Sequence, residues 1–245
     1  MIKVAVFGAH GRMGSQTVRA VAAADGLELV ATIGSGDDRE AAATADVVVD
    51  FTRPDVVLDN LHWCIEHQLH AVVGTTGLTE ERLDDLGRRL EGTGLGIVVA
   101  ANFSIGAVLT MRFAEQAARF YESVEIVELH HPNKVDAPSG TATATAARVS
   151  LARLESGLGP VPDATVQQID GARGAVVDGI HVHGVRLRGL VAHQEVLLGS
   201  EGETLTIRHD SLDRASFMPG VVAAVRAVGE RPGLTIGIED ILGLG

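Results

Sequence analysis

Residues 1–14 read MIKVAVFGAHGRMG, and this stretch decides the fold. Lys3–Phe7 is apolar and rich in β-forming residues, so it predicts a strand. Gly8, Gly11 and Gly14 then lead into a segment whose apolar residues recur at helical spacing. Such a turn lets a phosphate approach the backbone and meet the free N–H groups of a helix. The spacing G-x-x-G-x-x-G also fits an ordinary surface turn, so its position between strand and helix carries the prediction of dinucleotide binding.

Strand-like and helix-like segments alternate through the first 103 residues. Apolar runs separated by helical periodicity predict a parallel sheet with helices on both faces. Thr79 can cap one helix, and Glu80 and Glu81 in its first turn suit the helix dipole. The predicted strands are Lys3–Phe7, Glu28–Ile33, Asp46–Phe51, Ala71–Val73 and Ile97–Ala101, and the predicted helices are Arg12–Ala24, Pro54–His67 and one that begins after Thr79.

The pattern changes after the helix predicted at Ala107–Tyr121. Closely spaced alternating segments and one long helix favour a mostly antiparallel or mixed sheet with one face covered. The segments are the strands Val124–Leu129, His181–Leu187, Ala192–Leu198 and Thr204–Arg208 and the helix Thr141–Glu155.

The predicted fold class is therefore α/β, with a Rossmann-type parallel-sheet domain and an α+β domain. The helix Phe217–Ala227 and the tail GLTIGIEDILGLG can return to the first domain. We expect residues 1–103 and 215–245 to form a dinucleotide-binding domain, and residues 104–214 to form a domain for substrate binding and oligomerisation.

Composition excludes several classes of protein. The 245 residues carry a net charge of −12 and no basic run, which argues against binding to nucleic acid or to a membrane surface. No apolar run approaches the roughly 20 residues that a membrane helix needs. The N-terminus predicts a strand rather than a signal peptide, and the single cysteine, Cys64, suits the cytosol. We therefore expect a cytoplasmic protein.

A second cluster of polar residues lies in ELHHPNKVDAPSGTA, from Glu128 to Ala142. His130 and His131 end a predicted strand, and Lys134 follows closely. Neighbouring strand residues point to opposite faces, so the strand must end or bend at this pair. The Ser and Thr residues and the helix N-terminus beyond can receive a carboxylate, and histidine can donate a proton near neutral pH. Structural histidines are the alternative. We expect no metal site, because no third ligand clusters with the pair.

The end of the second strand bears on the choice of cofactor. Gly34 and Ser35 stand where an acid that holds the adenosine ribose is expected. Without that repulsion, and with Arg12 in the glycine turn, both NADPH and NADH should be accepted. A bent loop could still return Asp37 or the adjacent Asp38 to the ribose, and the following arginine would oppose it.

These motifs resemble the dihydrodipicolinate reductase family, and its actinobacterial members most closely. GAHGRMG, DFTRP, VGTTG, NFSIG and the His-His stretch occur in the family's order, and GLVAHQEVLLGSEGETLTIRHDSLDR resembles its C-terminal half. The resemblance thus covers the whole chain. The His-His stretch is highly specific, whereas the glycine turn alone is not.

The resemblance implies a role for each matching residue. His130 would be the proton donor and acceptor, and Lys134 would donate a proton or polarise the imine. His131 would bind one substrate carboxylate, and Gly140 and Thr141 the other. The implied cofactor-binding residues are Gly8, His10, Gly11, Arg12, Met13, Arg53, Gly74, Thr75, Thr76, Ala100, Ala101, Asn102 and Phe103.

The implied activity is NAD(P)H-dependent reduction of a small dicarboxylate, 4-hydroxy-tetrahydrodipicolinate, with loss of water in lysine and diaminopimelate biosynthesis. Members of the family are usually homotetramers. Two alternatives are another pyridine-nucleotide enzyme, such as an amino-acid dehydrogenase, and a non-catalytic sensor of NADP(H). The first would not need a dicarboxylate cradle beside a histidine pair, and the second would not need His130 and Lys134.

Overall fold

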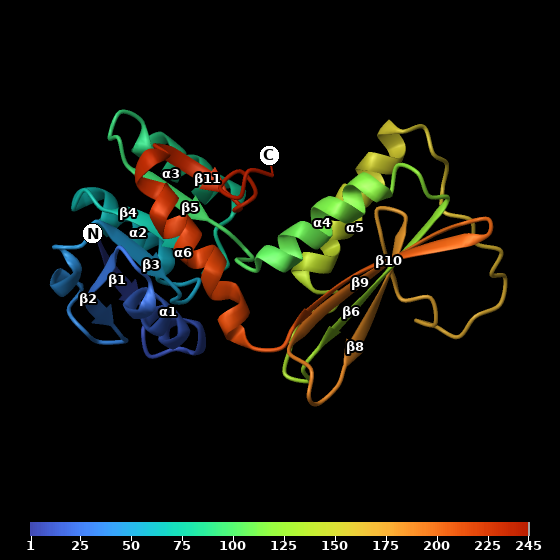
Figure 1. Ribbon diagram of the computed structural model, residues 1–245, viewed down its shortest axis with the longest axis horizontal. Coiled ribbons are helices and arrows are strands. Elements are labelled where there is room, and N and C mark those ends of the chain that lie inside the picture. Colours follow the sequence, from blue (N-terminus) through green and yellow to red (C-terminus); the bar gives the residue numbers. More distant parts are fainter. Residues whose placement is uncertain (245) are drawn as a thin grey trace. The chain divides into compact units, whose positions relative to one another are not determined.

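The structure is a computed structural model that describes residues 1–244, and the chain divides into two compact units. Unit 1 is formed by Met1–Ile105 together with the chain from Arg214 onward, and unit 2 by Gly106–Asp213. The colours of Figure 1 follow the sequence, so unit 1 contains both the blue segments and the red ones.

Unit 1 is built on a six-stranded parallel sheet in the order β11-β5-β4-β3-β1-β2. Since β2 pairs with one edge of β1 and β3 with the other, the strand order reverses at β1. The carboxyl ends of strands at such a point are where open α/β sheets bind ligands. The strands are β1 (Ile2–Phe7), β2 (Leu27–Ile33), β3 (Val47–Asp50), β4 (His70–Val73), β5 (Gly96–Val99) and β11 (Gly233–Ile236).

Helices cover both faces of this sheet (Figure 1). Helix α1 contacts α6 on one face, and α2 contacts α3 on the other. As predicted, Thr79 caps α3, since its hydroxyl accepts a hydrogen bond from the backbone N–H of Arg82 at 3.4 Å. The helices are α1 (Arg12–Ala23), α2 (Val57–Glu66), α3 (Glu80–Leu90) and α6 (Met218–Ala227), with short 3₁₀ segments η1 (Arg39–Ala42), η2 (Arg214–Phe217) and η3 (Val228–Glu230).

The apolar strands form the core of unit 1. Val4, Ala5 and Val6 of β1 are fully buried, as expected for a strand covered on both faces. Ala5 belongs to a hydrophobic core that also contains the single cysteine, which lies on α2. The runs of small aliphatic residues therefore build a rigid platform whose carboxyl edge carries the loops described below.

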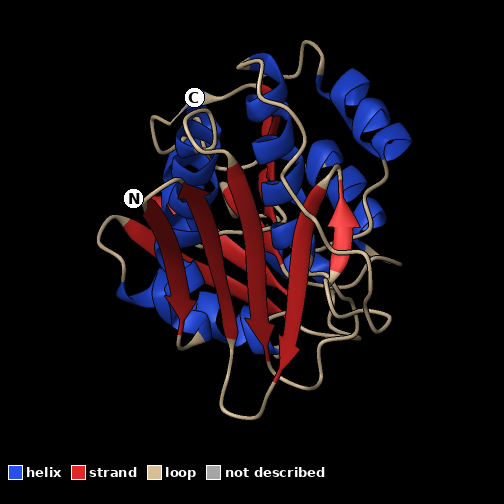
Figure 2. Ribbon diagram, turned by 90° about the vertical axis from the view of Figure 1, so that its right-hand side faces the viewer, coloured by secondary structure: helices blue, strands red, loops and turns tan. Residues whose placement is uncertain are grey.

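Unit 2 contains a five-stranded mixed sheet in the order β10-β9-β6-β8-β7. Strands β6 and β8 are parallel, and the other neighbours are antiparallel. Figure 2 looks onto the face of this sheet that its helices leave uncovered. The strands are β6 (Ser123–His130), β7 (Ala175–Val177), β8 (Ile180–Arg186), β9 (Ala192–Ser200) and β10 (Glu203–Ser211).

Helices α4 (Ile105–Ala117) and α5 (Gly140–Glu155) supply the other half of the core of unit 2. Burial alternates along β6: Val124, Ile126 and Glu128 are fully buried, whereas the residues between them are partly exposed. Glu128 therefore lies on the face that packs against α5, although it carries a carboxylate.

The parallel sheet of unit 1 and the mixed sheet of unit 2 confirm the predicted fold class. Among residues 1–244, none of the helices is both long and apolar enough to span a membrane.

Candidate active site

The turn between β1 and α1 packs its glycines against neighbouring backbone. Gly8 has a φ of +72°, and a Cβ on it would lie 2.4 Å from the carbonyl oxygen of Phe51. A Cβ on Gly14 would lie 2.0 Å from the carbonyl oxygen of Gly8. Gly11 is the N-cap residue of α1 and offers no side chain to the first N–H groups of that helix. The turn therefore requires glycine and presents N–H groups that suit a phosphate.

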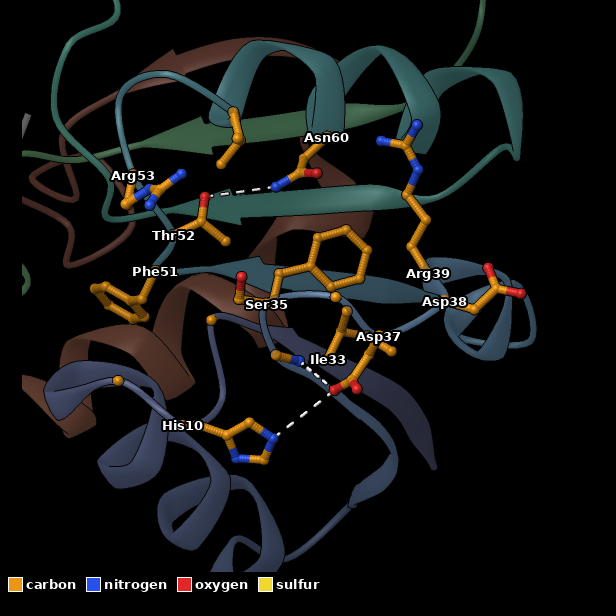
Figure 3. Close-up of a pocket in the computed structure, with 16 residues that line it drawn as sticks. His10, Ile33, Ser35, Asp37, Asp38, Arg39, Phe51, Thr52, Arg53 and Asn60 are labelled. Atoms are coloured by element: carbon orange, nitrogen blue, oxygen red, sulfur yellow. Dashed lines mark hydrogen bonds and ion pairs between the residues drawn. The ribbon is translucent and has the colours of Figure 1, made fainter.

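A cavity of about 640 Å³ opens beside this turn, at the carboxyl ends of β1, β2 and β3 (Figure 3). Cavities of this size commonly hold small ligands. Of the residues predicted to bind a cofactor, Gly8, His10, Gly11 and Arg53 line it. The remaining walls come from the ends of β1 and β2, from the segments that follow β2 and β3, and from Asn60 of α2.

The carboxylate of Asp37 lies at the end of β2, on the wall of this cavity (Figure 3). Its Oδ2 accepts a hydrogen bond from the backbone N–H of Gly34 at 2.7 Å and lies 3.8 Å from Nε2 of His10. A Cβ on Gly34 would lie 2.3 Å from the His10 ring and 3.1 Å from that same oxygen. The loop thus brings the Asp37 carboxylate back to the end of the strand. This was one of the two possibilities that the sequence left open. Asp38 instead caps η1 by accepting from Glu40 N–H at 3.0 Å.

Two arginines on the cavity wall are held by other groups. Arg39 donates from Nη1 to the carbonyl oxygen of Asp59 at 3.4 Å, and its guanidinium lies 5.8 Å from the centre of the Trp63 ring. Arg53 forms two hydrogen bonds with Asp55, at 3.0 and 2.8 Å. Both therefore face the cavity with their charge already partly balanced.

Arg12 and Met13 occupy the first two positions of α1. Arg12 is exposed, and neither side chain is among the described residues that line the cavity. The structure therefore places Arg12 at the helix N-terminus rather than on the wall that carries Asp37.

A buried carboxylate links the ends of β3 and β4. Asp50 is 1% exposed and accepts hydrogen bonds from Thr52 N–H at 2.8 Å, the Thr52 hydroxyl at 2.6 Å, Asn60 at 2.8 Å and the Thr75 hydroxyl at 2.8 Å. These contacts fix the predicted residue Thr75 and the loop that follows β3.

Phe51 packs against two of the residues predicted to bind the cofactor. A Cβ on Gly74 would lie 2.0 Å from the Phe51 ring, so only glycine fits there. Phe103 packs edge-to-face on Phe51, with ring centres 6.0 Å apart. Gly74 and Phe103 thus meet around one aromatic ring at the carboxyl edge of the sheet.

The other predicted residues of this region lie on the two loops that carry Gly74 and Phe103. Thr76 and Ala101 are exposed, and Ala100 is buried with its N–H bonded to the carbonyl oxygen of Val73 at 3.0 Å. Asn102 accepts a hydrogen bond from the backbone N–H of Ser104 at 2.8 Å, which holds the second loop in a turn.

In unit 2, β6 ends at His130, as the paired histidines predicted. Nδ1 of His130 lies 2.6 Å from Oε2 of Glu128, which is fully buried. The same carboxylate receives both Nη1 and Nη2 of Arg186 at 2.7 Å and the backbone N–H of Ser139 at 3.2 Å. One buried anion therefore joins β6, β8 and the start of α5.

The charges around this anion set two pKa values. Burial opposes ionisation of Glu128, but hydrogen bonds from Arg186 and His130 outweigh it and lower the pKa of the carboxyl group. Burial lowers the pKa of His130, hydrogen bonding to Glu128 raises it, and the charges of Lys134 and Arg186 lower it, with a net lowering. Glu128 is therefore ionised near neutral pH, and His130 is largely neutral.

Lys134 is paired with a carboxylate two residues later. Its Nζ donates to both oxygens of Asp136, at 2.7 and 2.9 Å. Hydrogen bonds from Lys134 and from the backbone of Gly140 lower the pKa of Asp136. The Asp136 carboxylate is thus held by the ammonium group of Lys134.

The structure also shows the surroundings of His131 and of the N-terminus of α5, which are predicted to bind the substrate carboxylates. Within residues 1–244, Nδ1 of His131 is buried and has no hydrogen-bond partner. Ser139 caps α5 by accepting from Ala142 N–H at 3.2 Å. Apart from the chain neighbours of Gly140 and the backbone of its own helix, no described atom lies within 4 Å of a Cβ built on Gly140. The carbonyl oxygen of Thr141 accepts from Thr145 at 2.8 Å. His131 has unused hydrogen-bonding capacity, and space opens at Gly140.

Sequence reasoning missed several members of these clusters. Glu128 precedes His130 by two residues in a strand, so the period of a strand could have placed both on one face. Asp136 follows Lys134 by only two residues, so the sequence could also have suggested that the two side chains pair. Arg186 comes from β8, and no local signal connects it with the histidine pair. Among residues 1–244, no group of three or more His, Cys, Asp or Glu side chains is arranged for a metal ion.

Comparison with protein families agrees with the resemblance. Residues 2–103 match the model described as "Dihydrodipicolinate reductase, N-terminus", and residues 106–242 match "Dihydrodipicolinate reductase, C-terminus". Together the two matches cover nearly the whole chain.

Individual relatives agree as well. The chain is 66% identical over 245 residues to the 4-hydroxy-tetrahydrodipicolinate reductase of Cutibacterium acnes, which covers 100% of both chains. It is 61% identical over 246 residues to the enzyme of that name from Streptomyces griseus, which covers 99% of this chain and 98% of the relative.

Solved structures extend the comparison. The dipicolinate-bound dihydrodipicolinate reductase of Paenisporosarcina sp. TG-14 is 38% identical and has a TM-score of 0.87, with 98% of this chain and 99% of the other covered. An amine dehydrogenase of Mycobacterium smegmatis is 14% identical and has a TM-score of 0.63, with 96% of this chain and 94% of the other covered. This second likeness shows the fold alone. By its sequence, both of its units and its fold, the chain belongs to the dihydrodipicolinate reductase family.

Proposed function

We propose that the protein reduces 4-hydroxy-tetrahydrodipicolinate to tetrahydrodipicolinate in the diaminopimelate route to lysine. Relatives with this enzyme name match the chain over its whole length. The net reaction replaces the 4-hydroxyl group of the substrate by hydrogen: one hydride enters, and the hydroxyl group leaves with a proton as water. The protein is thus an NAD(P)H-dependent oxidoreductase.

Unit 1 fits a dinucleotide. The β1–α1 turn follows a path that a Cβ on Gly8 or Gly14 would block, and the cavity beside it lies at the carboxyl ends of β1, β2 and β3. When bound, the reduced nicotinamide supplies the hydride. Gly8, Gly11 and the N-terminus of α1 would receive the phosphates, with His10, Arg12, Met13 and Arg53 around them. The residues proposed for the nicotinamide side are Gly74, Thr75, Thr76, Ala100, Ala101, Asn102 and Phe103.

Unit 2 would hold the substrate. His130 would deliver or accept a proton at Nε2, since its Nδ1 is engaged by Glu128. His131, whose Nδ1 has unused hydrogen-bonding capacity, would bind one carboxylate. Gly140 and Thr141 would bind the other at the N-terminus of α5, where backbone N–H groups favour anions. Lys134 would stabilise charge that develops at the ring nitrogen.

The observation that carries this assignment is the position of Asp136. Its carboxylate accepts two hydrogen bonds from Lys134 Nζ, and the backbone of Gly140 helps to lower its pKa. A carboxylate of the chain therefore already uses the ammonium group that is proposed to act on the substrate ring, and it lies near Gly140, which is proposed to receive a carboxylate of the substrate. This supports a dicarboxylate as ligand, with Asp136 giving up its contacts when the substrate binds.

We propose further that both NADH and NADPH serve, with Asp37 setting the balance between them. The carboxylate of Asp37 is placed to accept a hydrogen bond from a ribose hydroxyl and to repel a 2′-phosphate. Arg39 on the same wall opposes that repulsion, although Asp59 and Trp63 restrain its guanidinium. The balance predicts a preference for NADH without rejection of NADPH.

The unit from Met1 would be the dinucleotide-binding domain, and residues 104–214 the domain for substrate binding and oligomerisation. The family resemblance supports a homotetramer. The single cysteine, Cys64, supports a cytoplasmic location, since an intramolecular disulfide would need a second cysteine.

The test is a spectrophotometric assay with freshly prepared product of dihydrodipicolinate synthase. We expect oxidation of NADPH or NADH only when that product and the protein are both present. An amino-acid dehydrogenase would instead oxidise cofactor with a 2-oxo acid and ammonia. A cofactor sensor would bind the dinucleotide and oxidise none, and either result would overturn the proposal.

A further inference from the structure

We infer that Glu128 and Arg186 are positioning residues for His130, whose Nδ1 they fix as a hydrogen-bond donor so that Nε2 is the nitrogen that exchanges a proton. The role of His130 in proton exchange rests on the proposed function. The arrangement of the three side chains stands on the structure alone.

The carboxylate of Glu128 accepts four hydrogen bonds. Its Oε1 accepts from Arg186 Nη2 at 2.7 Å and from Ser139 N–H at 3.2 Å. Its Oε2 accepts from Arg186 Nη1 at 2.7 Å and from His130 Nδ1 at 2.6 Å. An ionised carboxylate offers about four acceptor sites and no donor. All four contacts are therefore satisfied only when Glu128 is ionised and Nδ1 of His130 carries a hydrogen.

This requirement fixes the tautomer of His130. In neutral imidazole one ring nitrogen carries the hydrogen and the other holds a lone pair. With Nδ1 donating to Glu128, the lone pair lies on Nε2. A free histidine interconverts between both forms, so the buried carboxylate selects one of them and holds the ring in one orientation.

The surrounding charges explain why an anion is needed here. His130 faces Glu128 on its own strand, Arg186 on β8 and Lys134 on the following loop. Asp136 pairs with Lys134 through its carboxylate and accepts from Arg186 Nη2 through its carbonyl oxygen at 2.7 Å. Of these groups, Glu128 makes the direct contact that favours a protonated ring. Without its charge, His130 would hold a proton only at lower pH.

Arg186 plays a different part in the pair. A lone carboxylate in a fully buried position would take up a proton rather than remain charged. Two hydrogen bonds from one guanidinium, in the planar geometry that suits a carboxylate, keep the charge in place. Arg186 therefore orients His130 through Glu128, while its own charge lowers the pKa of His130. Neither Glu128 nor Arg186 is among the residues proposed to bind the substrate.

Glu128→Gln tests the inference, because an amide cannot accept from four donors. We expect kcat to fall about 10- to 100-fold, within the range for impaired general acid catalysis, while KM for the substrate changes less than about threefold. The limb of the pH profile that reports His130 should move by about one pH unit to lower pH.

Glu125→Gln is the matched control. Glu125 lies on the same strand and also pairs with an arginine, Arg173, and a histidine, His183, but it is on the opposite face of the sheet. This variant should keep kcat within about twofold and leave the pH profile in place. An equal loss of kcat in both variants would indicate a general effect on unit 2 and would overturn the inference.

A second readout needs no substrate. In ¹⁵N-histidine NMR spectra of the wild-type protein, neutral His130, assigned by comparison with His130→Gln, should carry its hydrogen on Nδ1. In Glu128→Gln its titration midpoint should fall by about one pH unit, and in Glu125→Gln it should not move. Hydrogen on Nε2 in the wild type, or an unchanged midpoint in Glu128→Gln, would overturn the inference.

If Glu128→Gln does not fold, Glu128→Asp replaces it, because it keeps the charge for Arg186 and withdraws the carboxylate by one methylene. We then expect a smaller fall of kcat and mixed tautomers of His130, whereas wild-type behaviour in both would refute the positioning role. A wild-type protein without reductase activity would defeat the proposed function. The NMR result would then still decide how Glu128 acts on His130.

Discussion

The carboxylate of Asp37 accepts a 2.7 Å hydrogen bond from the backbone N–H of Gly34. A side chain at Gly34 would collide with His10 and approach that carboxylate. Gly34 therefore leaves space for the Asp37 carboxylate and also binds it. In this way the loop supplies the negative charge that the end of β2 itself lacks. The proposed choice of cofactor therefore depends on the charge of Asp37 rather than on the residue at position 34.

Asp37→Asn should raise the ratio of kcat/KM for NADPH over NADH by about tenfold. The amide oxygen can still accept from Gly34 N–H, so the loop should keep its shape while the charge that repels a 2′-phosphate is lost. The measurement is steady-state kinetics with both cofactors. Asp38→Asn is the control, because Asp38 caps η1 and an asparagine caps equally well. A ratio that responds to Asp38 and not to Asp37 would contradict the assignment.

His130→Gln and His131→Ala should affect different kinetic constants. Loss of a general acid typically lowers kcat by about 10²–10⁴-fold, so His130→Gln should act mainly on kcat. His131→Ala should mainly raise KM for the substrate, because it removes a binding contact from the ground state and the transition state alike. Substrate titrations at saturating cofactor separate the two effects. The reverse pattern would mean that the histidines have exchanged roles.

Lys134→Ala should remove most of the activity and leave the protein folded. The loss in kcat/KM should be about 10²–10³-fold, as expected for a group that stabilises developing charge. Lys134 lies in the loop between β6 and α5 and bonds to the exposed Asp136, so the thermal midpoint should change by only a few degrees. Thermal unfolding and kinetics on one preparation test both statements, and near-wild-type turnover would refute the role of Lys134.

Glu125→Gln should make the stability of unit 2 less dependent on acid. Burial raises the pKa of Glu125, but hydrogen bonds from Arg173 and His183 outweigh it, so the folded-state pKa is lowered. A lowered pKa contributes stability above the unfolded-state value of about 4.3, and this stability is lost as the pH falls through the folded-state pKa.

The wild type should therefore exceed Glu125→Gln by about 1–2 kcal/mol in free energy of unfolding near pH 7, and by less near pH 3. Urea titrations at both pH values measure the gap. Substitution of the exposed Glu203 by Gln should give no such gap. A gap that is equally large at both pH values would show that Glu125 acts through packing rather than charge.

The sequence predicted the fold well because its signals are local. The aliphatic runs of β1 to β5 and the helical periods between them depend on neighbouring residues, and the structure contains these elements. The strand Ala175–Val177 escaped prediction because three residues show no period, and it is defined by its pairing with β8.

The candidate site divides in the same way. His130, His131, Lys134 and Gly140 lie within eleven residues, so one motif brings them together. Arg186 on β8 helps to position His130 through Glu128, yet it lies 56 residues after His130 in the chain. Only the parallel pairing of β6 with β8 brings the two residues near each other. Asp37 depends on a turn whose course the sequence left open. Contacts made through sheet pairing and loop geometry were thus beyond local patterns.

The most direct test of the central claim follows the hydride itself. Wild-type protein would be incubated with freshly prepared synthase product and NADPH or NADH that carries deuterium at the transferable position of the nicotinamide. Mass spectrometry and NMR of the product would then locate the label. The account predicts one deuterium for each cofactor oxidised, at ring carbon 4 of tetrahydrodipicolinate, where the hydroxyl group was lost. Cofactor oxidation without deuterium in that product, or no oxidation with either cofactor, would contradict it.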